Sequence, residues 1–147
     1  MIYTELTKRA LLLSFEAHRE QRDKSEMPYV YHPFHVAEQM KDEDTTVAAL
    51  LHDVAEDTDI TIEDIRKMGF PDRVCDALKR LTHDKSVPYM EYIEGLRSDP
   101  IAAAVKLADL EHNSDLSRLD AVDDKALARA GKYKTAMELL KRGSKIT

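Results

Sequence analysis

A histidine and three acids fall within six residues of the segment ALLHDVAEDT, directly behind an apolar run. If this segment is a helix, the adjacent His52 and Asp53 diverge by about 100°. Glu56 then shares the face of His52, and Asp57 shares the face of Asp53. The apolar run has to be buried in a folded domain, so this ionisable group begins at the edge of a core. An imidazole with several carboxylates is a set that ligates divalent metals.

Burial of several carboxylates costs free energy unless a cation compensates them. A bound divalent metal therefore explains the group best, although a solvated acidic helix end is the simpler interpretation for any single acid. A mixed imidazole and carboxylate set suits manganese, iron, zinc or nickel and does not select among them. The segment predicts a transition-metal site without identifying the ion.

Two other segments carry residues that would complete such a site. The stretch YVYHPFHVAEQM supplies His32 and His35, and the stretch VKLADLEHNSDLSRL supplies Asp109. His112 and Asn113 follow Asp109 by three and four residues, so they lie on the same helical face. Each segment alone is weak evidence, because a histidine before proline is often a loop residue and an acid in a helix is usually solvated. Their order along the chain is what makes the set informative.

The elements that would hold these residues are helical. Apolar residues recur at spacings of three and four, and no run shows the strict alternation of a strand. Thr45 is the expected N-cap of the helix that carries His52, and Gly143 is the expected stop of the last helix. Thr61 with Asp64 resembles a capping box, and Asp99 before Pro100 is a typical helix start. We expect an all-α domain of about seven or eight helices, at about residues 2–20, 33–41, 45–56, 61–69, 71–81, 88–97, 100–116 and 123–142.

The composition narrows the class of protein. A chain of 147 residues with 43% hydrophobic and 34% charged residues suits one globular domain spanning residues 1–147. No apolar run reaches the length of a membrane span, and the N-terminal stretch lacks the pattern of a signal peptide. The single Cys75 cannot form an internal disulfide, so a cytoplasmic location is expected. The oligomeric state is left open, and a homo-oligomer is possible.

The net charge bears on the partners. At −6, it gives no support to nucleic-acid binding. A small anionic substrate would need local positive charge or a metal ion to overcome this field. The basic residues nearest in sequence to the metal segments are Arg19, Arg22, Lys24 and Lys106, with Arg118 and Lys134 as weaker candidates. Each of them alone is more often a solvated surface residue.

His32, the His52–Asp53 pair and Asp109 resemble the H…HD…D signature of the HD-domain metal-dependent phosphohydrolases. The stretches PYVYHPFHVA, AALLHDVAEDT and VKLADLEHN are similar to three consecutive blocks of one branch, the guanosine-tetraphosphate hydrolases of the RelA/SpoT type and their small stand-alone relatives. The resemblance covers about residues 15–118. The HDVAEDT block is its most specific part, since a bare His-Asp pair is common.

The resemblance implies a compact helical HD bundle that binds manganese and removes the 3′-pyrophosphate from guanosine 3′,5′-bispyrophosphates. The implied metal ligands are His32, His52, Asp53 and Asp109. Glu56 and Asp57 match the family's pair that positions and activates the attacking water. Asn113 matches the family's nucleotide contact, and the cations taken as substrate-binding are Arg22, Lys24 and Lys106.

The sequence departs from the family pattern on the substrate side. The family's run Arg-Lys-Ser-Gly-x-Pro-Tyr reads RDKSEMPY here, with Asp23 at the place of a base-stacking arginine and Glu26 at the place of the glycine. In the last block Leu110 and Glu111 replace arginine and leucine. Two alternatives therefore stay open: an HD phosphohydrolase for another nucleotide or phosphate ester, and a module that senses a nucleotide without cleaving it.

Overall fold

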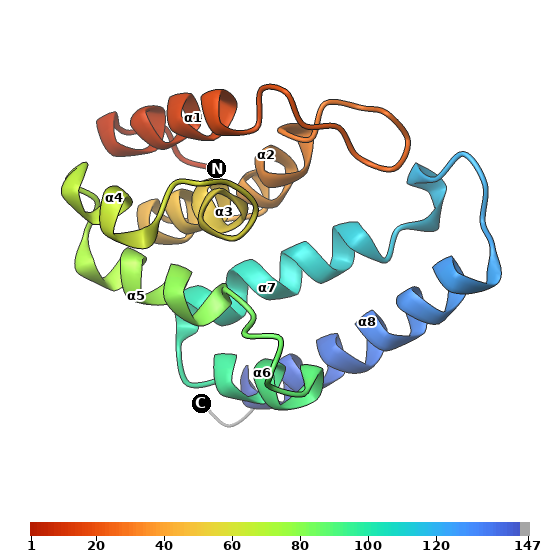
Figure 1. The fold of residues 1–147 in the computed structure, drawn as a ribbon. Coiled ribbons are helices and arrows are strands. Elements are labelled where there is room, and N and C mark those ends of the chain that lie inside the picture. The colour runs from red at the N-terminus through yellow and green to blue at the C-terminus, as the bar shows by residue number, and fades with distance from the viewer. Residues whose placement is uncertain (145–147) are drawn as a thin grey trace.

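The fold consists of α-helices arranged in layers (Figure 1). This computed structural model describes residues 1–144, and within them it contains eight α-helices and no strand. None of these helices has the combination of length and apolar character that a membrane span requires. The elements are α1 Glu5–Ala17, α2 Tyr31–Glu38, α3 Glu43–Asp57, α4 Ile62–Lys67, α5 Asp72–Leu81, α6 Tyr89–Leu96, α7 Pro100–Asn113, the 3₁₀ turn η1 Leu116–Arg118 and α8 Asp124–Ser144.

Several helices begin where side-chain caps satisfy their free N–H groups. The predicted capping box of α4 is confirmed, because the Thr61 and Asp64 side chains each accept a hydrogen bond from the other residue's backbone N–H. Asp99 caps α7 by accepting from two backbone N–H groups, with Pro100 as the first helical residue, as predicted. These short-range signals need no tertiary contact, which is why the sequence alone locates them.

The predicted cap of α3 is wrong by three residues. Asp42, not Thr45, is the N-cap, and its Oδ1 accepts from the backbone N of Thr45 at 2.8 Å and from the Thr45 hydroxyl at 2.7 Å. The earlier start is favoured because Glu43 and Asp44 then occupy the first turn, where the helix dipole stabilises negative charge. The helix is therefore longer than expected and runs to Asp57.

Other boundaries also differ from expectation, since α1 is shorter than the predicted 2–20 at both ends and α7 ends at Asn113 rather than at 116. The helix α2 begins at Tyr31 rather than at Pro33, because the turn from Pro28 already closes hydrogen bonds to Tyr31 N, and Pro33 falls in a first turn where its missing N–H costs nothing. The predicted stop at Gly143 is wrong, since α8 extends to Ser144. A glycine inside a helix costs about 1 kcal/mol and does not by itself end the helix.

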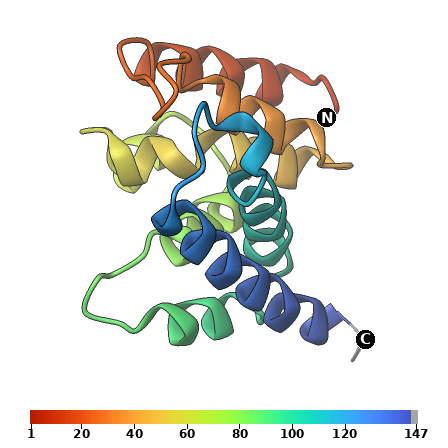
Figure 2. The ribbon, with the colours of Figure 1, turned by 90° about the vertical axis from the view of Figure 1, so that its right-hand side faces the viewer.

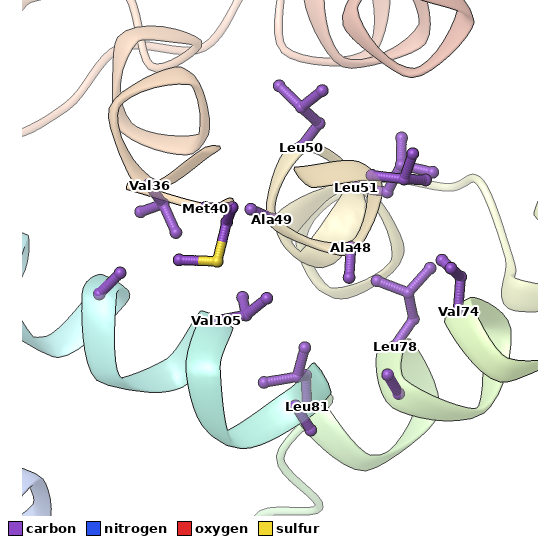
Figure 3. Packing of buried hydrophobic residues seen from close by; sticks show 14 of the residues in the cluster. Val36, Met40, Ala48, Ala49, Leu50, Leu51, Val74, Leu78, Leu81 and Val105 are labelled. Carbon is purple, nitrogen blue, oxygen red and sulfur yellow. The ribbon is translucent and has the colours of Figure 1, made fainter. Parts of the chain in front are cut away.

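The helix α3 lies at the centre of the molecule. It contacts α1, α2, α5 and α7, and its residues from Thr45 to Val54 are all buried. In Figure 3 Leu50 points toward α1, while Leu78 of α5 and Val105 of α7 point toward α3. Burial on every side explains why this helix reads as a nearly continuous apolar run. The chemistry-bearing residues follow at its C-terminal end.

The last helix completes a further layer. α8 lies beside α6 and packs against α6 and α7, on the side of α7 away from α1 (Figures 1 and 2). The link from α7 to α8, which includes η1, runs alongside the loop between α1 and α2. This arrangement places the N-terminal part of α8 next to the residues that precede α2.

Candidate active site

Four buried side chains from three helices converge at the centre of the bundle. His32 comes from α2, His52 and Asp53 from α3, and Asp109 from α7, and each is at most 7% exposed. His32 Nε2 lies 2.7 Å from Asp109 Oδ1. His52 Nε2 lies 3.2 Å from Asp53 Oδ2 and 3.6 Å from Asp109 Oδ1. All four sequence-predicted ligands are thus brought together.

The donor atoms of this group suit a divalent cation. Ligand atoms of His32, His52 and Asp109 all lie within 4.8 Å of one another. The Nδ1 atom of His52 lies 2.6 Å from the Ala49 carbonyl oxygen, whereas its Nε2 atom is buried without a hydrogen-bond partner. A buried ring nitrogen rarely stays unpaired, and a metal ion beside the carboxylates would satisfy it. The residues present therefore fit a transition-metal site.

The electrostatics of the group also favour a cation. Burial opposes protonation of His52, but the carboxylates of Asp53 and Asp109 outweigh it and raise the His52 pKa to about 9. The pKa of Asp109 is well below its usual range, because Lys106 and the two histidines outweigh the effect of burial. The centre thus attracts positive charge, which a bound metal would provide.

Lys106 and Asn113 both bind the carboxylate of Asp109. The Lys106 Nζ atom lies 2.9 Å from Asp109 Oδ2, and the Asn113 amide donates to Asp109 Oδ1 at 3.1 Å. Burial lowers the pKa of Lys106, but Asp109 outweighs this and raises it above its ordinary value. Asn113 also lines the adjoining cavity, whereas Lys106 is not part of its wall. The structure therefore places Lys106 beside the predicted metal ligand Asp109 and not in the cavity wall.

Glu56 and Asp57 end α3 and are exposed. Partial loss of solvation of the carboxyl groups, followed by repulsion from the Asp53 carboxylate, raises the pKa of both residues. The Gln21 amide donates to the Asp57 carbonyl oxygen at 3.1 Å, which ties the end of α3 to the chain that follows α1. The two acids thus stand in electrostatic contact with the metal group.

A cavity of about 330 Å³ opens beside His32. Arg22, Lys24 and Asn113, three of the predicted substrate contacts, line it together with the weaker candidate Arg118. Two residues of α8 that sequence reasoning missed, Arg129 and Tyr133, form another part of its wall. Their spacing of four residues put both on one helical face, but they lie far in sequence from every metal segment. Lys134, the other weak candidate, is not in the wall.

The departures from the family pattern have structural roles here. The Asp23 carboxylate accepts from the backbone N of Ser25 and Met27 at 2.8 and 3.0 Å, and its other oxygen lies 3.9 Å from an Arg118 nitrogen. Asp23 therefore closes the loop and pairs with a cation of the cavity wall. Glu26, at the family's glycine position, has φ of 63° in the left-handed region. The loop thus keeps a backbone conformation that glycine adopts more readily.

Tyr29 is a further residue of the site that sequence reasoning missed. Its hydroxyl donates to Asp53 Oδ2 at 2.8 Å, and its side chain lines the cavity. Burial and the Asp53 carboxylate raise the pKa of this tyrosine, so it stays neutral and acts as a donor. The tyrosine that precedes His32 by three residues was visible in the sequence, but nothing there indicated its partner.

Comparison with known proteins adds an independent observation. The model of the HD domain matches residues 10–129 of this chain. The chain belongs to the HD-domain family. The predicted all-α HD bundle is confirmed, because a solved structure titled "A metazoan ortholog of SpoT hydrolyzes ppGpp and plays a role in starvation responses" superposes with a TM-score of 0.74. That match has 31% identity and covers 97% of this chain and 87% of the other.

Curated relatives are also named as hydrolases of guanosine bis(diphosphates). The guanosine-3′,5′-bis(diphosphate) 3′-pyrophosphohydrolase MESH1 of Drosophila melanogaster is 42% identical over 113 residues, which is 67% of this chain and 63% of the relative. The guanosine-3′,5′-bis(diphosphate) 3′-pyrophosphohydrolase of Aquifex aeolicus is 34% identical over 119 residues, which is 73% of this chain and 17% of the relative. The chain thus spans less than two thirds of the length of these relatives.

Proposed function

We propose that this chain is a metal-dependent phosphohydrolase that removes the 3′-pyrophosphate from guanosine 3′,5′-bis(diphosphates). The observation that carries the proposal is the convergence of four buried ligand-type side chains, one with an unpaired ring nitrogen, beside a cavity lined by arginine and lysine. The activity in the names of the MESH1 and Aquifex relatives supports the choice of substrate. Removal of this alarmone would connect the protein with the stringent response.

The metal would be held by His32, His52, Asp53 and Asp109, and we propose Mn²⁺ as the ion. When bound, such an ion lowers the pKa of a water molecule and polarises a phosphoryl oxygen. Tyr29 holds one oxygen of Asp53, and Lys106 and Asn113 hold the two oxygens of Asp109. These contacts fix the direction in which each carboxylate presents its remaining lone pairs.

We assign the proton-accepting role to Glu56, with Asp57 as its neighbour. A general base works best when its pKa approaches the operating pH, and the pKa of Glu56 is raised in that direction. Both acids lie one turn after the His52–Asp53 pair, at the open end of α3. The carboxylate that does not take the proton would position the water and the metal ligands.

The cavity wall supplies charge neutralisation for a polyphosphate. Arg22, Lys24, Arg118 and Arg129 lie around one volume, and phosphoryl transfer depends mainly on positioning and compensation of charge. We place the diphosphates among these four cations and Asn113. Tyr133 offers an aromatic face in the same wall for the base.

The direct test measures pyrophosphate release from ppGpp by the purified protein with Mn²⁺. We expect turnover that excess EDTA abolishes, and its loss in His52→Ala and in Asp53→Ala. A matched control is His83→Ala, a histidine outside the group. Full activity in EDTA, or unchanged activity in either of the first two variants, would refute the metal assignment.

A second candidate function is hydrolysis of another nucleotide or phosphate ester. Asp23 favours it, because an acid stands where the family has a base-stacking arginine. Leu110 and Glu111 give it little support, since neither lines the cavity and Leu110 is buried in the core. A panel of nucleotides with Mn²⁺, scored for the phosphate products, separates the two candidates and also detects a sensor that binds without cleavage. The cytoplasmic location and the possible homo-oligomer stay predictions.

A further inference from the structure

The ring of His32 is held by a second imidazole that none of the assigned roles uses. The Nδ1 atoms of His32 and His112 are 2.7 Å apart, their ring planes differ by 9°, and their centroids are 5.0 Å apart. That separation is close to the nitrogen–nitrogen distance plus two ring radii. The two rings therefore lie edge to edge in one plane, which is the geometry of an in-plane N–H···N hydrogen bond rather than of a stack.

Such a contact carries one proton, and the opposite nitrogen of His32 decides which ring provides it. The Nε2 atom of His32 points into the ligand group, 2.7 Å from Asp109 Oδ1. A nitrogen that binds a metal has no proton, so the single proton of a neutral His32 must be on Nδ1. His112 then accepts with its Nδ1 atom and has to carry its own proton on Nε2.

A third histidine holds His112 in place. The ring centroids of His35 and His112 are 4.0 Å apart and their planes differ by 21°, so these two rings stack face to face. The Arg118 guanidinium donates to the His112 carbonyl oxygen at 2.8 Å and so fixes the end of α7. His32 and His35 are three residues apart on α2, so one helix supplies both neighbours of the His112 ring.

We infer that His112 is a positioning residue that fixes His32 as its Nδ1–H tautomer and aims Nε2 at the metal, while His35 holds the His112 ring by stacking. The inference rests on the proposed metal site. Metal-binding histidines usually donate their second N–H to a carboxylate, a backbone carbonyl or water, and loss of such a partner weakens metal binding about 10–100-fold. Here a side-chain imidazole takes that place.

The tautomers can be measured without nucleotide. A long-range ¹H–¹⁵N NMR spectrum of the Zn²⁺-loaded protein reports which ring nitrogen of each histidine carries a proton. We expect His32 protonated on Nδ1 and His112 on Nε2. A spectrum with His112 protonated on Nδ1, or a protein that binds no Zn²⁺, would overturn the inference. A failure of ppGpp hydrolysis alone would leave this result unchanged, so the two failures are distinguishable.

Substitutions separate the hydrogen bond from the ring. His112→Phe keeps a ring for the stack on His35 but has no acceptor, and His112→Asn keeps an acceptor near the Nδ1 position. Titration calorimetry with Mn²⁺ should show about 10–100-fold weaker binding for His112→Phe and nearly wild-type binding for His112→Asn. The matched control His35→Phe retains the stack and should bind Mn²⁺ normally. Circular dichroism first confirms that both His112 variants are folded. Unchanged Mn²⁺ binding in His112→Phe, or equally weakened Mn²⁺ binding in both variants, would then contradict the assignment.

Discussion

The Glu56 carboxyl shows how one residue trades stability for chemistry. The folded protein raises its pKa above that of the unfolded chain, so its ionisation destabilises the fold as the pH rises through this interval. Below the unfolded pKa the carboxyl is neutral in both states and the penalty disappears. A neutral isostere should therefore stabilise the metal-free protein at neutral pH while it removes the proposed base.

We predict that Glu56→Gln raises the urea midpoint of the metal-free protein at pH 7.5 and leaves it unchanged near pH 4. The same substitution should lower the rate of ppGpp hydrolysis about 10²–10⁴-fold. Glu111→Gln, an exposed change outside the cavity wall, serves as the control for both measurements. Retained turnover in Glu56→Gln would remove Glu56 from the mechanism, and an equal midpoint shift at both pH values would remove the linkage argument.

At the scale of single residues, the sequence predicted which four side chains the structure brings together, but it did not predict that Tyr29 holds one of them. His32, His52, Asp53 and Asp109 were visible because each stands in a short block with a recognisable spacing. Tyr29 was in view within one of these blocks, but its hydrogen bond to Asp53 joins a loop to a helix 24 residues away. Partners of that kind depend on tertiary packing, which periodicity does not encode.

At the scale of elements, the loop between α1 and α2 is held in its shape by side chains that differ from the family's. The Asp23 carboxylate closes the turn, and Glu26 follows it in the left-handed region. This conformation is about 1–2 kcal/mol less favourable for a residue with a Cβ atom, whereas glycine has no such strain. Glycine also destabilises the fold by about 0.5–1 kcal/mol, because it raises the conformational entropy of the unfolded chain. The net change should therefore be small and favourable.

We predict that Glu26→Gly raises the free energy of unfolding by about 0.5 kcal/mol, the difference between these two effects. Glu26→Ala removes the same carboxylate and retains the strained backbone, so it should give no such gain. Denaturant unfolding of the two variants measures the difference between them. Equal stabilisation by glycine and alanine would mean that the side-chain charge, rather than the backbone, destabilises this turn.

Helix boundaries were predictable where local chemistry determines them. The starts of α4 and α7 each depend on a capping side chain that bonds a backbone N–H two or three residues further on, and both starts were located correctly. The start of α3 was misplaced because Asp42 and Thr45 are both good caps, and the acidic first turn decides between them. The part that α8 plays in the cavity could not be predicted, because it arises from the packing of α8 on α6 and α7.

At the scale of the whole molecule, stability should depend on the metal. The ligand group joins α2, α3 and α7, so an ion bound there connects three helices of the bundle. A ligand that binds only the folded state adds about 2.7 kcal/mol at 100 times its dissociation constant. For a chain of this size that corresponds to an increase in melting temperature of about 5–10 °C.

We predict this increase on addition of Mn²⁺ and its reversal by EDTA, measured by differential scanning calorimetry. His52→Ala should abolish the response, because it removes one ligand from the centre of the group. Leu12→Ala, a change at an exposed position of α1, should leave the response intact. An equal metal response in His52→Ala would place the binding site elsewhere.

The position of α8 has a consequence for inactivation. Arg129 and Tyr133 come from α8, a helix at the edge of the bundle, whereas the four metal-binding candidates belong to α2, α3 and α7. Loosening of α8 alone would remove one wall of the cavity without displacing any of the proposed metal ligands. If warming loosens α8 before the inner helices, the protein should lose affinity for the proposed nucleotide at a lower temperature than it loses the proposed metal, and a warmed sample would be inactive but still metal-bound.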